Sequence, residues 1–157
     1  MNRHRQVALV VVACATVVWA SGSAVRSGAA ASGAQKTAAA PGGVIVQTDA
    51  EVAAAEPGPH QGGGQTIGHS FFRDVAGLNL VFRKRVLKPG AGIGHHVQAE
   101  DEIYYVMSGR GQMTLDGKTV DVGPGTAILT RTGSSHSLRQ VGTDDLVIII
   151  NYERQVK

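Results

Sequence analysis

The sequence predicts an all-β domain, either a barrel or a sandwich, over residues 65–157. Short runs rich in β-branched and aromatic residues recur along this region, and turn-forming glycines and prolines separate them. No segment keeps a helical periodicity for more than two turns. A region of this length can bury one small core, and a closed or paired arrangement would protect its strand edges.

The first expected strands alternate with glycine-containing breaks. In residues 78–87, LNLVFRKRVL, the large apolar side chains of Leu78, Leu80 and Phe82 occupy alternate positions. The segment KPGAG at residues 88–92 ends this run. Residues 102–108, EIYYVMS, are β-branched and aromatic, and GRG at residues 109–111 ends that run. We therefore expect one strand in each of the two apolar segments.

A hairpin is expected next, because Asp116-Gly117 suits the positive φ angles of a two-residue turn. The segments QMTL and KTVDV flank this turn. The remaining expected strands are residues 126–130, 136–141 and 146–152.

The densest basic run lies in the first of these strands. Arg83, Lys84 and Arg85 follow one another directly. We interpret them as a solvated strand edge rather than an anion-binding site, since charged side chains at a strand edge guard against aggregation.

The N-terminus has the features of a targeting signal. A basic start precedes the apolar run 7–20, which is too short to span a membrane comfortably, and small residues follow it. We predict a signal peptide over residues 1–24, with Ala24 a plausible cleavage point, and an exported, periplasmic or extracellular protein. An uncleaved anchor and a lipid anchor at Cys14 are the alternatives.

Removal of this signal changes the composition. Cys14 and Trp19 are the only cysteine and tryptophan, so the mature protein would have no disulfide. Loss of Arg3 and Arg5 leaves 13 basic residues against 12 acidic ones, so the pI of 9.3 overstates the basic character. Charge therefore gives no reason to expect a nucleic-acid partner.

Residues 25–64 are predicted to form a flexible linker or arm. They are rich in Ala, Gly, Ser and Pro, and a segment with so few large apolar side chains cannot offset its ordering entropy. The run GGVIVQ at residues 42–47 is the exception and could dock as an extra strand. His60 lies in the arm, where we expect it to be solvated.

Two spaced sets of residues stand out within the domain. The first set begins with Gly90 and, after five intervening residues, His96. Gln98 follows after one further residue, Glu102 after three more, and Gly109 after six more. The second set contains, in chain order, Gly125, Arg131, Gly133, His136 and Gln140. In order and spacing these sets resemble the two signature motifs of the cupin family, and the resemblance covers residues 90–140.

Three positions depart from the cupin pattern. Gln98 stands where a second histidine is usual, Arg131 replaces a proline, and Gln140 replaces an asparagine. The alternative register, with His95 as the first ligand, would place Val97 at the second ligand position. We prefer the register of His96 and Gln98, because it matches both the residue count and the ligand chemistry.

The resemblance implies a double-stranded β-helix, or jelly-roll, barrel with a divalent transition metal inside. The ligands would be His96, Glu102 and His136. Gln98 would be either a fourth ligand or a residue that contacts the ligands without binding the metal. Two histidines and one carboxylate with open positions also form a set that suits Fe, Mn, Zn, Ni or Co on chemical grounds alone. An open position allows a substrate or water to bind the metal.

Two further side chains are candidates for the pocket. Tyr104 shares a strand face with Glu102 and could supply a catalytic hydroxyl, although simple packing is the alternative. Arg131 stands near the start of a loop and could bind an anionic substrate at the mouth, although a solvated arginine is equally compatible with the sequence.

Two classes of function remain open. One is a metal-dependent enzyme acting on a small organic molecule, either a dioxygenase or an isomerase or lyase. The other is a non-catalytic metal- or small-ligand-binding module of the cell envelope, since fold alone does not decide chemistry. Similar small cupins often dimerise, so we also expect a homodimer. A membrane would be contacted only through an uncleaved signal or a lipid anchor.

Overall fold

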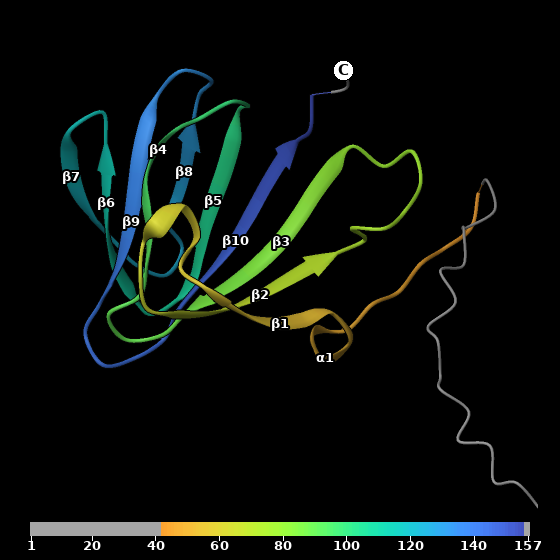
Figure 1. Cartoon of the computed structure of the whole chain (residues 1–157), viewed down its shortest axis with the longest axis horizontal. Coiled ribbons are helices and arrows are strands. Elements are labelled where there is room, and N and C mark those ends of the chain that lie inside the picture. The colour runs from red at the N-terminus through yellow and green to blue at the C-terminus, as the bar shows by residue number, and fades with distance from the viewer. Residues whose placement is uncertain (1–41, 156–157) are drawn as a thin grey trace, which may run out of the picture. The chain divides into compact units, whose positions relative to one another are not determined.

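A computed structural model describes residues 42–155 (Figure 1). The predicted signal peptide and the first part of the predicted arm lie outside the described residues. Among residues 42–155, no helix is long and apolar enough to cross a membrane.

Short helical turns and strands alternate at the start of the described region. These elements are α1 (Asp49–Val52), β1 (Ala53–Pro57), the 3₁₀ turn η1 (Pro59–Gln61), β2 (Gln65–Phe71) and β3 (Leu80–Leu87). The strands that follow are β4 (Gly92–Val97), β5 (Glu102–Ser108), β6 (Arg110–Leu115), β7 (Lys118–Val122), β8 (Ala127–Thr130), β9 (Ser135–Val141) and β10 (Leu146–Glu153).

The strands form two antiparallel sheets that pack against each other (Figure 1). One sheet has six strands in the order β1-β2-β3-β10-β5-β8, and the other has four in the order β4-β9-β6-β7. Buried residues from both sheets form one apolar cluster, which includes Val106 and Ile148 from the larger sheet and Met113 and Leu138 from the smaller one. The all-β prediction is confirmed, and the two sheets are consistent with a jelly-roll.

The predicted hairpin is confirmed as the β6–β7 turn. Asp116 and Gly117 have φ angles of 45° and 81°, so both central residues adopt the left-handed conformation that a tight hairpin turn requires. The expected strand at residues 102–108 coincides with β5.

The predicted flexible arm differs from the structure in its C-terminal part. Residues 53–57 form β1, which pairs antiparallel with β2 at the edge of the six-stranded sheet. Small side chains in β1 bury little surface, so backbone hydrogen bonds and one ion pair from Glu56 hold it instead. The suggested strand at residues 42–47 is wrong, because residues 43–48 are irregular and Val44 and Val46 are 91% and 81% exposed.

The interpretation of the basic run as a solvated strand edge is also wrong. Strand β3 lies inside its sheet, between β2 and β10. Arg85 is only 2% exposed, and its guanidinium lies 2.8 Å from the Glu56 carboxylate and donates to the Thr66 hydroxyl at 2.7 Å. Lys84 pairs with Asp49. The arm that the sequence left free thus supplies the acids that neutralise two of these cations.

The hairpin turn generates a stability prediction. We expect Gly117→Ala to lower the free energy of unfolding by about 1 kcal/mol, because an alanine in the left-handed region is strained. Nothing lies within 4 Å of an added Cβ at Gly117, so strain alone would be measured. Gly123→Ala is the matched control, because Gly123 also faces open space but has no positive φ. Equal urea midpoints for the two variants would contradict the prediction.

Candidate metal centre

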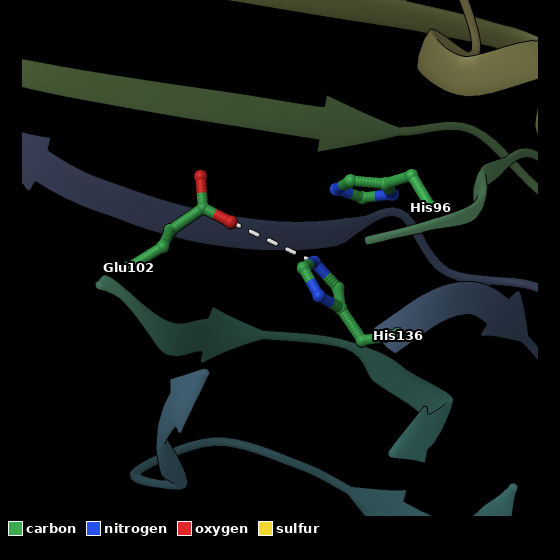
Figure 2. Close-up of side chains that lie close together, drawn as sticks. All are labelled: His96, Glu102 and His136. Atoms are coloured by element: carbon green, nitrogen blue, oxygen red, sulfur yellow. Dashed lines mark ion pairs between the residues drawn. The ribbon is translucent and has the colours of Figure 1, made fainter. Parts of the chain in front are cut away.

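Three side chains from three strands converge inside the fold (Figure 2). His96 on β4 and His136 on β9 are directly paired across the four-stranded sheet. Glu102 begins β5 in the other sheet and reaches toward them. One potential ligand atom from each residue lies within 4.8 Å of the others.

The two most buried members of this group are poorly satisfied by the protein. His136 is fully buried, Glu102 is 6% exposed, and Glu102 Oε2 lies 3.6 Å from His136 Nε2, beyond hydrogen-bonding distance. Glu102 Oε2 and His136 Nδ1 have no hydrogen-bond partner among the described residues. A buried carboxylate oxygen without a partner is costly, and a cation beside it would remove that cost.

Burial alters the protonation of both residues. It raises the pKa of the Glu102 carboxyl and lowers the pKa of His136 to about 4. His136 is therefore a neutral imidazole at pH 7, which is the form that binds metals. The same burial that disfavours an isolated Glu102 carboxylate would favour it beside a divalent cation.

His96 is held in an orientation that suits a ligand. Its Nδ1 donates a hydrogen bond of 2.9 Å to the carbonyl of Gly94, which leaves the Nε2 lone pair free. Such an outer hydrogen bond fixes the tautomer of ligating histidines. Two imidazoles and one carboxylate thus fit a divalent transition metal, and His96, Glu102 and His136 would hold it.

The neighbours of His96 face different ways. His95 is exposed, and Val97 is 64% exposed. Gln98 is buried and lines the same cavity as His96 and Glu102. Its backbone N–H donates to the Ser134 carbonyl, and its own carbonyl accepts from the N–H of Gly133, so the two motifs meet here.

Tyr104 lies inside the site. Its hydroxyl shares a hydrogen bond of 2.8 Å with His136 Nε2, and its ring also belongs to the apolar core. Burial raises the pKa of Tyr104 well above its usual range, so the phenol stays protonated at neutral pH. The residue thus combines the two roles that the sequence left open, packing and a hydroxyl directed at the site.

The structure does not bring Arg131 to the cavity. Its side chain is 72% exposed and its Nε lies 2.7 Å from the carboxylate of Asp101.

Gln140, at the end of the second motif, has a structural role. Its side chain accepts from the N–H of Gly90 and donates to the carbonyls of Gly142 and Asp144.

Sequence reasoning missed several residues that line the cavity. The cavity has a volume of about 320 Å³. Besides the ligand group and the expected Gln98 and Tyr104, its polar lining includes His60, Arg83, Arg85, Glu100, Tyr152 and Arg154. His60 was expected to be solvated; it is exposed, but its ring stacks on His96 with centroids 3.6 Å apart. No local signal marked it, because the contact depends on η1 docking against β4.

The converging side chains generate a prediction about metal content. We expect His96→Ala and His136→Ala each to abolish stoichiometric metal binding, and His95→Ala to leave it nearly intact, because His95 points to solvent. Gln98→His should strengthen binding, since imidazole is the better donor for a borderline metal. Elemental analysis of purified folded variants measures the metal-to-protein ratio. Loss of metal in His95→Ala with retention in His96→Ala would contradict the register.

Comparisons with known proteins agree with this arrangement. Residues 84–152 match the family model of the Cupin domain. An oxalate-binding protein of Thermotoga maritima is 37% identical over 67 residues, which are 42% of this chain and 55% of that protein. The match therefore spans about half the length of that curated relative.

Solved structures show the same fold over a longer stretch. A predicted oxalate decarboxylase from Thermotoga maritima is 25% identical, with a TM-score of 0.64 over 71% of this chain and 100% of that one. A polyketide cyclase from Streptomyces resistomycificus is 19% identical, with a TM-score of 0.58 over 71% of this chain and 81% of that one. Residues 84–152 of this chain therefore form a domain of the cupin family.

Proposed function

We propose that this protein binds a divalent transition metal through His96, Glu102 and His136 and uses it to hold a small carboxylic acid in the cavity. The observation that carries the proposal is the buried Glu102 oxygen without a partner, beside a neutral imidazole. The similarity to an oxalate-binding protein supports a carboxylate as the ligand class.

The cavity lining also favours an anion. Arg83, Arg85 and Arg154 line it together with the ligand group. When bound, a divalent metal supplies positive charge that attracts and polarises carboxylate oxygens. The Tyr104 hydroxyl, which meets His136 Nε2 at 2.8 Å, would donate a hydrogen bond to the same oxygens by turning away from that nitrogen. The buried Ile93 and Ile150 exclude water from the inner wall. Gln98 is placed to support the bound acid or the metal.

Catalysis is the second candidate function, and the position of Glu100 in the cavity favours it. This carboxylate lines the cavity two residues before Glu102, and we assign it no ligand role. It could move a proton to or from a bound acid, as a lyase or isomerase requires. A dioxygenase would consume O₂, a lyase would release CO₂ from an acid without O₂, and a binding module of the cell envelope would do neither. Export behind the predicted signal peptide forms part of the proposal.

The binding proposal predicts that oxalate binding depends on the metal. We expect the protein to bind oxalate in isothermal titration, and chelation of the metal to abolish the heat of binding. His136→Ala should behave like the chelated protein. Gly123→Ala, which alters an open loop position, should bind as the parent does. Undiminished binding after chelation, with metal loss verified by elemental analysis, would contradict the proposal.

We also propose that the protein is a homodimer. Ile103, Tyr105 and Met107 on β5 are exposed on the outer face of the six-stranded sheet. The exposed Leu129 of β8 is the cross-strand partner of Ile103 and continues this apolar face. Contiguous exposed apolar faces are uncommon on soluble monomers, and a second copy could bury the same face by two-fold symmetry.

The dimer proposal predicts that a charge on this face separates the subunits. We expect Ile103→Glu to shift the protein from dimer to monomer in light scattering after size-exclusion chromatography, because an unpaired carboxylate cannot be buried cheaply. Val120→Glu is the control, since Val120 is similarly exposed but lies on β7 of the other sheet. A parent protein that is monomeric at all concentrations would refute the proposal.

A further inference from the structure

We infer that Arg73, Arg83 and Arg154 form a second anion-binding subsite, where the cavity of the metal-ligand group meets a neighbouring cavity. The ligand would then be an organic acid with two anionic groups, one bound near the metal ligands and the other held by these arginines. This inference rests on the proposed binding of a carboxylate at the metal and extends it, because it names a longer ligand than oxalate.

The sheet register places Arg83 on the same face as the metal ligands. Tyr104 on β5 is paired with Ile150 on β10, and Ile150 is paired with Arg83 on β3. Cross-strand partners point to the same side of a sheet, so Arg83 shares the inner face with Tyr104. Two strand spacings separate their backbones by about 10 Å.

Two cavities meet at this arginine. The cavity that contains the metal-ligand group has a volume of about 320 Å³, and a neighbouring one has about 350 Å³. Both are lined by Arg83, Tyr152 and Arg154, and the second is also lined by Arg73. Arg83 and Arg154 thus stand where a ligand that extends away from the metal ligands would pass.

No carboxylate among the described residues neutralises Arg73, Arg83 or Arg154 by an ion pair. Arg83 Nε donates to the Ser70 hydroxyl at 3.1 Å. Arg85 differs, because Glu56 pairs with it.

Three carboxylates also line these cavities, and they do not cancel the charge. Glu102 belongs to the metal-ligand group and Glu56 is engaged by Arg85. Glu100 lies in the first cavity only, two residues before Glu102. Positive charge therefore dominates where the two cavities meet, and an arginine fork recognises carboxylate or phosphate groups with high geometric specificity.

The ligand must be longer than oxalate to use both subsites. The two carboxyl carbons of oxalate are directly bonded, so an oxalate at the metal ligands presents no second anion at a distance. A diacid such as glutarate separates its carboxylates by three methylene groups. Phosphoglycolate places a phosphate at the far end instead, so these two probes distinguish the two anion types.

Paired ligands test the second subsite in the metal-loaded protein. We expect glutarate to bind roughly tenfold more tightly than butyrate, or phosphoglycolate roughly tenfold more tightly than glycolate, because the second anion gains charge-assisted hydrogen bonds. The pair that shows the increment identifies the anion type. Arg83→Gln should remove the increment, which is measured between the two ligands of a pair within the same variant, so any effect of Arg83 on the first carboxylate cancels.

Further variants complete the test. Arg154→Gln should reduce the same increment, which keeps the test valid if Arg83→Gln does not fold. Arg139→Gln is the charge-matched control, because Arg139 is exposed on β9 and lines neither cavity. Oxalate binding without an increment for either pair, or an increment that survives both cavity variants, would overturn the second subsite alone. Absence of metal-dependent oxalate binding would overturn the proposed function as well.

Discussion

The close approach of Glu102 and His136 joins the two sheets inside the fold, and both the candidate metal centre and the cavity depend on it. Glu102 begins a strand of the six-stranded sheet, and His136 lies within the four-stranded one, yet their side-chain atoms come to 3.6 Å. Each of the two residues keeps one buried side-chain atom without a hydrogen-bond partner among the described residues, and such atoms are costly to bury. A cation beside the Glu102 carboxylate would offset this cost, and buried ionisable groups of this kind are common at functional sites.

The inner face of the larger sheet changes from polar to apolar along β5. On β5 it runs from Glu102 through Tyr104 to the fully apolar Val106, and the apolar end packs against Met113 and Leu138 of the smaller sheet. The polar end borders the cavity with its arginines. One end of the two-sheet layer thus supplies packing energy, and the other can hold polar groups and a ligand. This division explains how a small domain can carry buried ionisable residues.

Residue spacing singled out three side chains that the structure brings together, His96, Glu102 and His136. The two-residue period of strands places Glu102, Tyr104 and Val106 on one face, and the motif count selected His96 over His95. The direction of Arg131, which the sequence left open, could not be predicted in this way. A loop residue has no period to set its direction, and Asp101 draws this arginine away from the cavity. His60 and Arg154 escaped notice because each reaches the cavity from a segment distant in sequence from the motifs.

Local chemistry and spacing by themselves determined the all-β class, the Asp116-Gly117 turn and the residues that converge at the candidate metal centre. These features depend on side-chain period and backbone conformational preference, which act over a few residues. Only the tertiary structure decided that the end of the arm joins the sheet, that Glu56 neutralises a buried Arg85, and that Arg83 faces the cavity. The physical reason is that strand order and register, set by long-range pairing, decide which face and which partner each side chain receives.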